Sequence, residues 1–204
     1  GVIVLGRARM TARGDEAAAS PGSGSPASFS DFTGEPAWAV KLKGSISDPG
    51  HLSRHAVRAR KKGNAIHRAL SWIGFLPIGD ETIEAFARTA AVHEGIPDAA
   101  QEVGRSLKAF FANDRFRPFF ETGPDVSFFN EREIVDGNGN TFKMDRIIVR
   151  PGLVEVIDYK TGEIRSDTHV DQVSRYGRLL SEVYGDRDVR GFLLYLDDGE
   201  VVRI

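Results

Sequence analysis

The chain contains no cysteine among its 204 residues. This absence excludes disulfide bonds, thiolate zinc sites, iron–sulphur clusters and a cysteine nucleophile. It is also compatible with a cytoplasmic protein, which is what we expect. Long apolar runs are missing as well. No stretch approaches the roughly 20 apolar residues of a membrane span, and the apolar start at residues 2–5 is too short for the core of a signal peptide.

A strong excess of either charge is also lacking. Lys and Arg number 27, Asp and Glu number 29, and the formal net charge is −2. Binding to a phosphate backbone would therefore need a local basic patch. The densest basic run comprises Arg54, Arg58, Arg60, Lys61, Lys62 and Arg68. It is either a solvated helix face or a surface that follows phosphates, and the sequence favours neither interpretation.

The composition changes along the chain and predicts two regions. Residues 11–36 are dominated by Gly, Ser, Ala and Pro without apolar periodicity, which is typical of a linker. We therefore expect an N-terminal segment with a flexible linker over residues 1–36 and one folded domain over residues 37–204. Regular structure should begin near His51.

Local patterns in the second region predict an α/β fold. Apolar periodicity predicts helices over 51–75, 80–94 with Asp80 as N-cap, 97–112 with Pro97 in its first turn, and 168–185. Alternating and β-branched residues predict strands over 126–135, 140–149 and 153–160, followed by two strands within 191–204. The intervening DGNGN sequence predicts a hairpin between the first two strands.

Two charged residues share one face of the third predicted strand. Alternation places Asp158 and Lys160 together and turns Tyr159 to the opposite layer. Asp145 lies in the apolar part of the preceding strand, so antiparallel pairing would bring it near Asp158. Such carboxylates repel each other unless a cation lies between them, and Mg²⁺ and Mn²⁺ prefer oxygen ligands. The competing interpretation is a surface hairpin whose acids are solvated or paired with Arg146 and Lys160, and for an isolated Asp–x–Lys it is the commoner one.

Further motifs extend this pattern over about residues 50–204. In order they are Gly63-Asn64-Ala65-Ile66-His67, Glu133, Asp145, Asp158-Tyr159-Lys160-Thr161 and Gln172-Val173-Ser174-Arg175-Tyr176. The series resembles the RecB/AddA-like nuclease domain of the PD-(D/E)XK superfamily, the C-terminal nuclease domain of UvrD-like helicase–nucleases. The resemblance implies a restriction-endonuclease-like core with a mixed central sheet flanked by helices, plus an N-terminal helical section. Without cysteines, the iron–sulphur branch of this family is excluded.

The same resemblance implies roles for individual residues. His67, Asp145 and Asp158 would be ligands of Mg²⁺ or Mn²⁺, with the Tyr159 carbonyl as a further ligand. Lys160 would position the attacking water and stabilise charge in the transition state.

Other residues would support these ligands. Glu133 would complete the acidic cluster through a second metal or a water. Glu131 stays the alternative, although the pattern favours Glu133. Gln172 and Tyr176 would support the site and contact the nucleic-acid backbone. The basic run, with Arg58 and Lys61 in it, would contact DNA.

The function expected from this resemblance is metal-dependent hydrolysis of DNA phosphodiester bonds in break repair or recombination, by an exonuclease or an endonuclease. The partners would be DNA and a helicase motor in the same polypeptide or complex, with no membrane. The alternative is a catalytically inactive nucleic-acid-binding module of the same fold, and a protein-interaction domain is the weaker third hypothesis. The five phenylalanines at 110, 111, 116, 119 and 120 are predicted to pack in the core rather than to stack bases.

Overall fold

The computed structural model describes residues 2–4, 53–162 and 166–204, with backbone alone for residues 2–4. These residues belong to one compact unit. The linker expected at residues 11–36, and the expected start of the domain at residue 37, lie outside the described residues.

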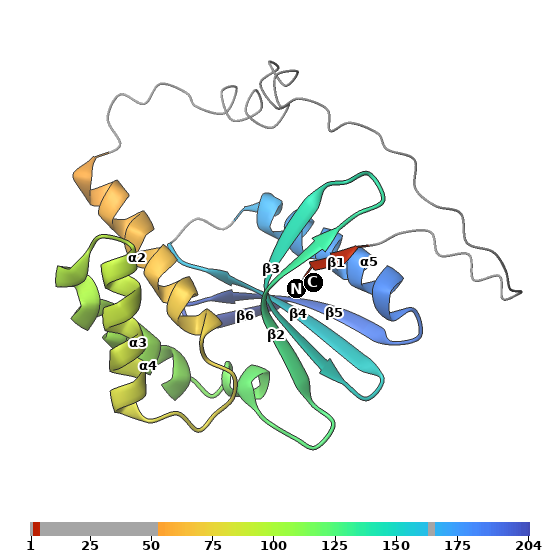
Figure 1. Cartoon of the computed structure of the whole chain (residues 1–204), viewed down its shortest axis with the longest axis horizontal. Helices are drawn as coiled ribbons and strands as arrows, with labels where there is room; N and C mark the ends of the chain where they lie inside the picture. The colour runs from red at the N-terminus through yellow and green to blue at the C-terminus, as the bar shows by residue number, and fades with distance from the viewer. Residues whose placement is uncertain (1, 5–52, 163–165) are drawn as a thin grey trace, which may run out of the picture. The chain divides into compact units, whose positions relative to one another are not determined.

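The described strands form one six-stranded mixed sheet whose spatial order follows the chain (Figure 1). The strands are β1 (Val2–Val4), β2 (Ser127–Val135), β3 (Thr141–Arg150), β4 (Leu153–Lys160), β5 (Asp188–Tyr195) and β6 (Glu200–Arg203). The pairs β1–β2 and β4–β5 are parallel, and the other three pairs are antiparallel. The α/β class with a mixed sheet is therefore confirmed.

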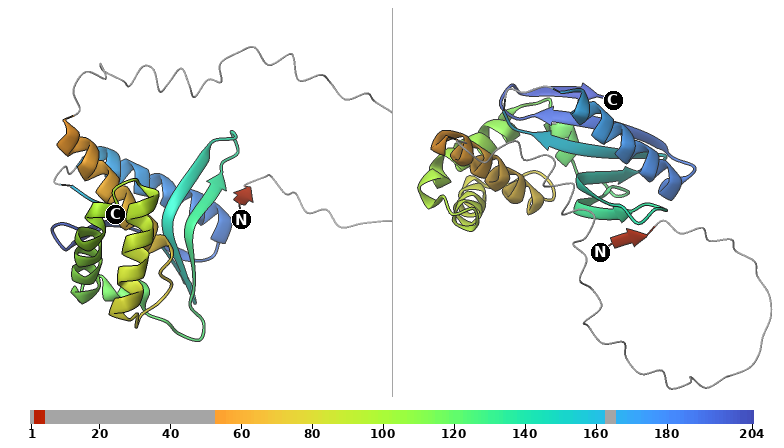
Figure 2. Two further views of the ribbon diagram at one scale, coloured as in Figure 1. Left: turned by 60° about the vertical axis from the view of Figure 1, so that its left-hand side comes forward. Right: turned by 90° about the horizontal axis from the view of Figure 1, so that it is seen from above.

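Helices cover both faces of this sheet (Figures 1 and 2). They are α2 (Arg54–Ser71), α3 (Asp80–His93), α4 (Ala100–Ala112) and α5 (Asp167–Tyr184), with short 3₁₀ helices η2 (Pro97–Ala99) and η3 (Arg117–Phe120). The group α2–α4 packs on one face, where Ile148 and Ile157 are buried. Helix α5 packs on the other, over Val156 and Leu193. No helix in the described part of the chain has the length and apolar character needed to cross a bilayer.

The local predictions are largely confirmed. Asp136 closes the predicted hairpin by accepting hydrogen bonds from the backbone N–H groups of Asn138 and Asn140. The predicted N-cap at Asp80 is wrong by one residue. Gly79 takes the extended capping conformation, and Asp80 begins α3, where its charge suits the positive end of the helix.

The phenylalanine group is also placed as predicted. Phe110, Phe116, Phe119 and Phe120 are buried in the core beneath α2–α4, and Phe111 packs against it. Their rings contact one another, Phe110 stacking on Phe116 and meeting Phe120 edge-on. They fill the helical layer and do not form a surface for bases.

Two acidic residues lie where β2 and β3 change the face that they present. Met144 and Ile147 pack in the same layer with α5, although residues three apart on a regular strand face opposite sides. The alternation therefore breaks at Asp145, between them. On β2 the facing position is Glu131, which has a positive φ of 53°. Both carboxylates thus lie at a backbone irregularity, where the side chains of the two strands do not alternate regularly between the faces of the sheet.

Candidate active site

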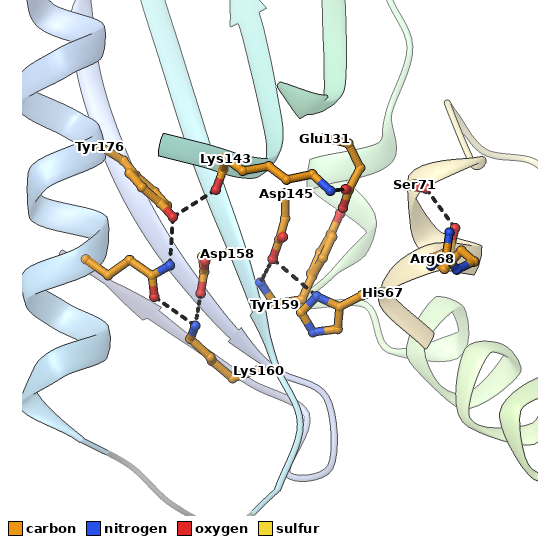
Figure 3. A network of polar contacts seen from close by, with 11 residues as sticks. His67, Arg68, Ser71, Glu131, Lys143, Asp145, Asp158, Tyr159, Lys160 and Tyr176 are labelled. Atoms are coloured by element: carbon orange, nitrogen blue, oxygen red, sulfur yellow. Dashed lines mark hydrogen bonds and ion pairs between the residues drawn. The ribbon is translucent and has the colours of Figure 1, made fainter. Parts of the chain in front are cut away.

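Helix α2, strand β3 and strand β4 meet at the carboxylate of Asp145 (Figure 3). His67 Nδ1 of α2 lies 3.5 Å from Asp145 Oδ2. The same oxygen accepts a hydrogen bond of 2.9 Å from the backbone N–H of Tyr159. The His67 ring also meets the Tyr159 ring edge-on, with centroids 5.8 Å apart. An imidazole and a carboxylate are therefore held together, and both stay partly exposed.

A second row of contacts runs from Asp158 to helix α5. Asp158 Oδ2 lies 2.5 Å from Lys160 Nζ, which donates a hydrogen bond of 3.1 Å to Gln172 Oε1. Gln172 Nε2 donates to the hydroxyl of Tyr176, which donates to the backbone carbonyl of Lys143. Asp158 and Lys160 thus share the face toward α5, as alternation predicts, and Gln172 and Tyr176 fix the lysine (Figure 3).

The surroundings of Asp158 disfavour the charged form of its carboxylate. It is only 3% exposed. Burial raises its pKa to about 6, the negative charge of Asp145 adds to the rise, and Lys160 opposes it. Asp158 Oδ2 lies 2.5 Å from the Lys160 ammonium, so the buried carboxylate has a cationic partner. A buried carboxylate beside a second acid is stabilised by positive charge, which Lys160 supplies here and which a bound cation would increase.

Tyr159 faces away from this row, into the layer of α2–α4. Its ring is 2% exposed, and its hydroxyl has no hydrogen bond among the described residues. Burial raises the pKa of the Tyr159 hydroxyl, and burial likewise raises that of Tyr176. Both phenols therefore keep their protons, which suits the donor role of Tyr176 toward the Lys143 carbonyl.

An open depression of about 720 Å³ lies along α2. Its lining includes Arg60, Lys62, His67, Arg68, Glu131 and Lys143. Glu131 forms an ion pair with Lys143. Glu133, which the sequence pattern favours over Glu131, does not line this depression. The structure therefore brings Glu131 rather than Glu133 to the same hollow as His67, because β2 changes face at Glu131.

The basic residues of α2 have different surroundings. Arg58 pairs with Asp98 at 2.5 Å, and Arg68 pairs with Glu94 at 3.0 Å. Neither Arg58 nor Lys61 lines the depression. Arg60 does line it and has no ion-pair partner in the part of the chain that the structure describes. The sequence could not separate Arg58 from Arg60, because the acid that pairs with Arg58 is 40 residues away.

Two residues near the site belong to none of the motifs that the sequence indicates. Lys143 lines the depression, and its backbone carbonyl accepts a hydrogen bond from the hydroxyl of Tyr176. Arg146, beside Asp145, is completely buried. Its guanidinium lies between the rings of Phe120 and Phe128, at 4.2 Å and 4.8 Å. The interpretation that Arg146 pairs with a nearby acid is wrong, because the residue turns into the helical layer instead.

The hydrogen bonds of Arg146 join distant segments. Its guanidinium donates to the backbone carbonyls of Ile73, Gly74 and Phe119 and to Asn130 Oδ1. The segment after α2, the 3₁₀ helix η3 and strand β2 are thereby tied to β3 next to Asp145.

The donor set fits a hard divalent cation in kind, with one imidazole and two carboxylates, one of them buried. It is not assembled as a ready cluster. Among the residues that the structure describes, no three His, Asp or Glu side chains are grouped to hold a metal ion. His67 and Asp145 stand together, whereas Asp158 is drawn to Lys160.

No protein-family model matches the chain, and a search of the curated proteins found no match. Statements about function therefore rest on the side chains described above and on the motifs in the sequence.

Proposed function

We propose that this chain is a Mg²⁺- or Mn²⁺-dependent nuclease that hydrolyses phosphodiester bonds in DNA. The observation that carries the proposal is the buried carboxylate of Asp158. It lies near Asp145 and pairs with a lysine that Gln172 holds in place. Perturbed acids of this kind concentrate at functional sites, because a folded chain has little other reason to keep them.

The side chains divide the chemistry between them. A divalent cation, when bound, would offset the charges of Asp145 and Asp158 and polarise the phosphate. His67 and Asp145 would hold it from the side of α2, with the Tyr159 carbonyl as a further ligand. Lys160 would orient the attacking water and stabilise the negative charge that develops on the phosphate oxygens.

The surroundings of Lys160 suit that role. Gln172 accepts from its ammonium group, and Tyr176 orients Gln172. The lysine is therefore held by the hydrogen bonds of α5 and loses little freedom when substrate binds. Glu131, in the same depression as His67, is the acid that this geometry favours over Glu133 for completing the site.

DNA would be held by its phosphates. Arg60 and Lys62 on α2 and Lys143 on β3 bring positive charge to the depression, although the whole chain carries a net charge of −2. The resemblance to the RecB/AddA nucleases of the PD-(D/E)XK superfamily supports the same function. It also supports a role in DNA break repair, with a helicase motor in the same polypeptide or complex.

The proposal is tested with purified Asp158→Ala and Lys160→Ala. Each should reduce Mn²⁺-dependent cleavage of single- and double-stranded DNA by about 100-fold or more, because Asp158→Ala removes a metal ligand and Lys160→Ala removes the cation that stabilises charge on the phosphate. Circular dichroism would verify that the fold is retained, and Glu182→Gln, an exposed change on α5, is the matched control. Cleavage that persists in either variant would refute the nuclease assignment.

The second candidate is a nucleic-acid-binding module of the same fold without catalysis. The absence of a ready three-residue cluster in the described chain and the contact of Lys160 with Asp158 favour it. Calorimetric titration with Mn²⁺ separates the two functions. Heat of binding that disappears in Asp158→Ala supports the nuclease, whereas a silent titration alongside intact DNA binding supports the binding module.

A further inference from the structure

Helix α2 lies close to the end of β4 at Gly63. A Cβ atom placed on Gly63 would lie 2.5 Å from Thr161 Oγ1, well inside van der Waals contact. Thr161 directly follows Lys160, the last residue of β4. A glycine inside a helix destabilises the helix relative to alanine, yet α2 runs through Gly63 without a break. The glycine therefore permits the close approach of α2 to Thr161 and does not stabilise the helix itself.

His67 stands one turn further along the same helix. Residues four apart share a helix face, and their separation along the axis is about 6 Å. His67 contacts the Asp145 carboxylate and the Tyr159 ring. The contacts at Gly63 and at His67 thus join the same side of α2 to the end of β4 and its neighbour β3.

We propose that the Gly63–Thr161 contact sets the distance between α2 and β4 and thereby places the His67 imidazole against Asp145. Gly63 and Thr161 are positioning residues that touch neither substrate nor metal. A methyl group at Gly63 would overlap Thr161 Oγ1 while Thr161 Cβ stays at 3.5 Å, so either the threonine side chain turns or α2 moves away from β4. Functional groups must be held to about 0.5 Å, so a movement of α2 by the size of the overlap, about 1 Å, would displace His67. The consequence for metal binding rests on the proposed function, whereas the placement of His67 does not.

The first test is made without metal, by NMR of the His67 ring protons. These protons lie beside the Tyr159 ring and are sensitive to its ring current. Their signals are assigned with His67→Gln. Gly63→Ala should shift them, and Gly63→Ala combined with Thr161→Ala should return them toward the positions in Thr161→Ala alone. Gly63→Ala combined with Thr161→Val should stay shifted, because valine keeps the branched shape of threonine.

The second test measures the affinity for Mn²⁺ by calorimetry. Gly63→Ala should weaken binding by about 10- to 100-fold, the usual effect of losing a group that orients a ligand. In the Thr161→Ala background the same change should cost less than about threefold. In the His67→Gln background it should cost nothing further, because the glycine acts through that histidine. A general structural defect would weaken binding in all three backgrounds.

Gly177→Ala is the matched control. Gly177 lies inside α5, and nothing stands within 4 Å of a Cβ atom at that position. The substitution is the same, in another helix, but without the close neighbour. It should leave both the His67 signals and the affinity for Mn²⁺ unchanged.

Three results would overturn the proposal. One is unchanged His67 signals in Gly63→Ala. Another is that Gly63→Ala changes the His67 signals and the affinity for Mn²⁺ equally in the parent protein and in the Thr161→Ala background. If Gly63→Ala does not fold, Gly63→Ala combined with Thr161→Ala is tested in its place. Failure of this double variant to fold is the third result that would overturn the proposal. A parent protein that binds no Mn²⁺ contradicts the proposed function instead, while the NMR comparison still tests the spacing contact.

Discussion

The buried carboxylate of Asp158 costs stability when it is ionised. Its carboxylate is buried near Asp145, and these surroundings raise its pKa to about 6. In the unfolded chain an aspartate titrates near pH 3.9. Because the native pKa is the higher one, the folded protein binds a proton more readily between these values. The contribution of this group to stability is present below about pH 4 and is lost as the pH rises through about 6.

Asp158→Asn should therefore stabilise the metal-free protein at pH 8, by about 1–3 kcal/mol, and have little effect near pH 4. The variant removes a buried charge that the protein retains for its site, so it should also abolish cleavage. Urea unfolding in EDTA at the two pH values measures the effect, with Glu182→Gln as the exposed control. A variant that is less stable than its parent at pH 8 would contradict the account of Asp158.

Arg146 is the opposite kind of residue, a buried charge whose role is structural. Arg146→Met should destabilise the protein by about 3–5 kcal/mol, because the carbonyls of Gly74 and Phe119 would lose the guanidinium that donates to them. Arg146→Lys should recover little, since an ammonium cannot reproduce the planar group between two aromatic rings. Urea unfolding measures both, and the exposed Arg178→Met is the control. Near-native stability of Arg146→Met would show that these bonds contribute little.

At the scale of elements, α2 carries basic residues with two kinds of surroundings. Arg58 and Arg68 pair with acids beyond its own sequence, and Arg68 lines the depression together with Arg60 and His67. Its basic run is therefore neither simply a solvated face nor entirely a phosphate-binding surface. In the proposed function, the basic residues that line the depression would be the ones to meet DNA.

Arg60→Ala should weaken DNA binding and reduce the slope of log affinity against log salt by about one, as expected for one lost phosphate contact. Arg58→Ala is the matched comparison on the same helix and should leave that slope unchanged, because Arg58 is occupied by Asp98. Fluorescence anisotropy with labelled DNA over a series of salt concentrations measures both. Equal effects of the two variants would argue against the depression as the place of binding.

At the scale of the whole molecule, the site lies where two apolar layers meet one sheet. Helices α2–α4 bring His67 from one face, and α5 brings Gln172 and Tyr176 from the other. Strands β3 and β4 carry the two aspartates between these layers. A cation held by His67 and both aspartates would therefore link α2 to the central strands and stabilise the fold as a unit.

Mn²⁺ at about 100 times its Kd should add about 2.7 kcal/mol to the free energy of unfolding, which raises Tm by about 5–10 °C for a chain of this size. Asp158→Ala should lose the rise, Glu182→Gln should keep it, and EDTA should reverse it. Scanning calorimetry gives the measurement. An equal rise in the Asp158→Ala variant would place the metal elsewhere.

The sequence by itself determined the elements and the order of the motifs. Helix and strand periods, the DGNGN turn and the alternation of Asp158, Tyr159 and Lys160 are local properties, and the structure agrees with them within a few residues. The order of these elements also gave the α/β class, whereas the mixed sheet between helices was expected from the family resemblance of the motifs.

Only the tertiary structure decided which side chains lie next to one another. Glu131 reaches the depression instead of Glu133 because β2 changes face where it meets Asp145. Among the described residues Arg58 is paired and Arg60 is not, because an acid on a distant segment reaches only Arg58. Gly63 lies against Thr161, almost 100 residues away. Each of these outcomes depends on contacts between remote parts of the chain or on a backbone irregularity, and neither leaves a periodic trace in the sequence.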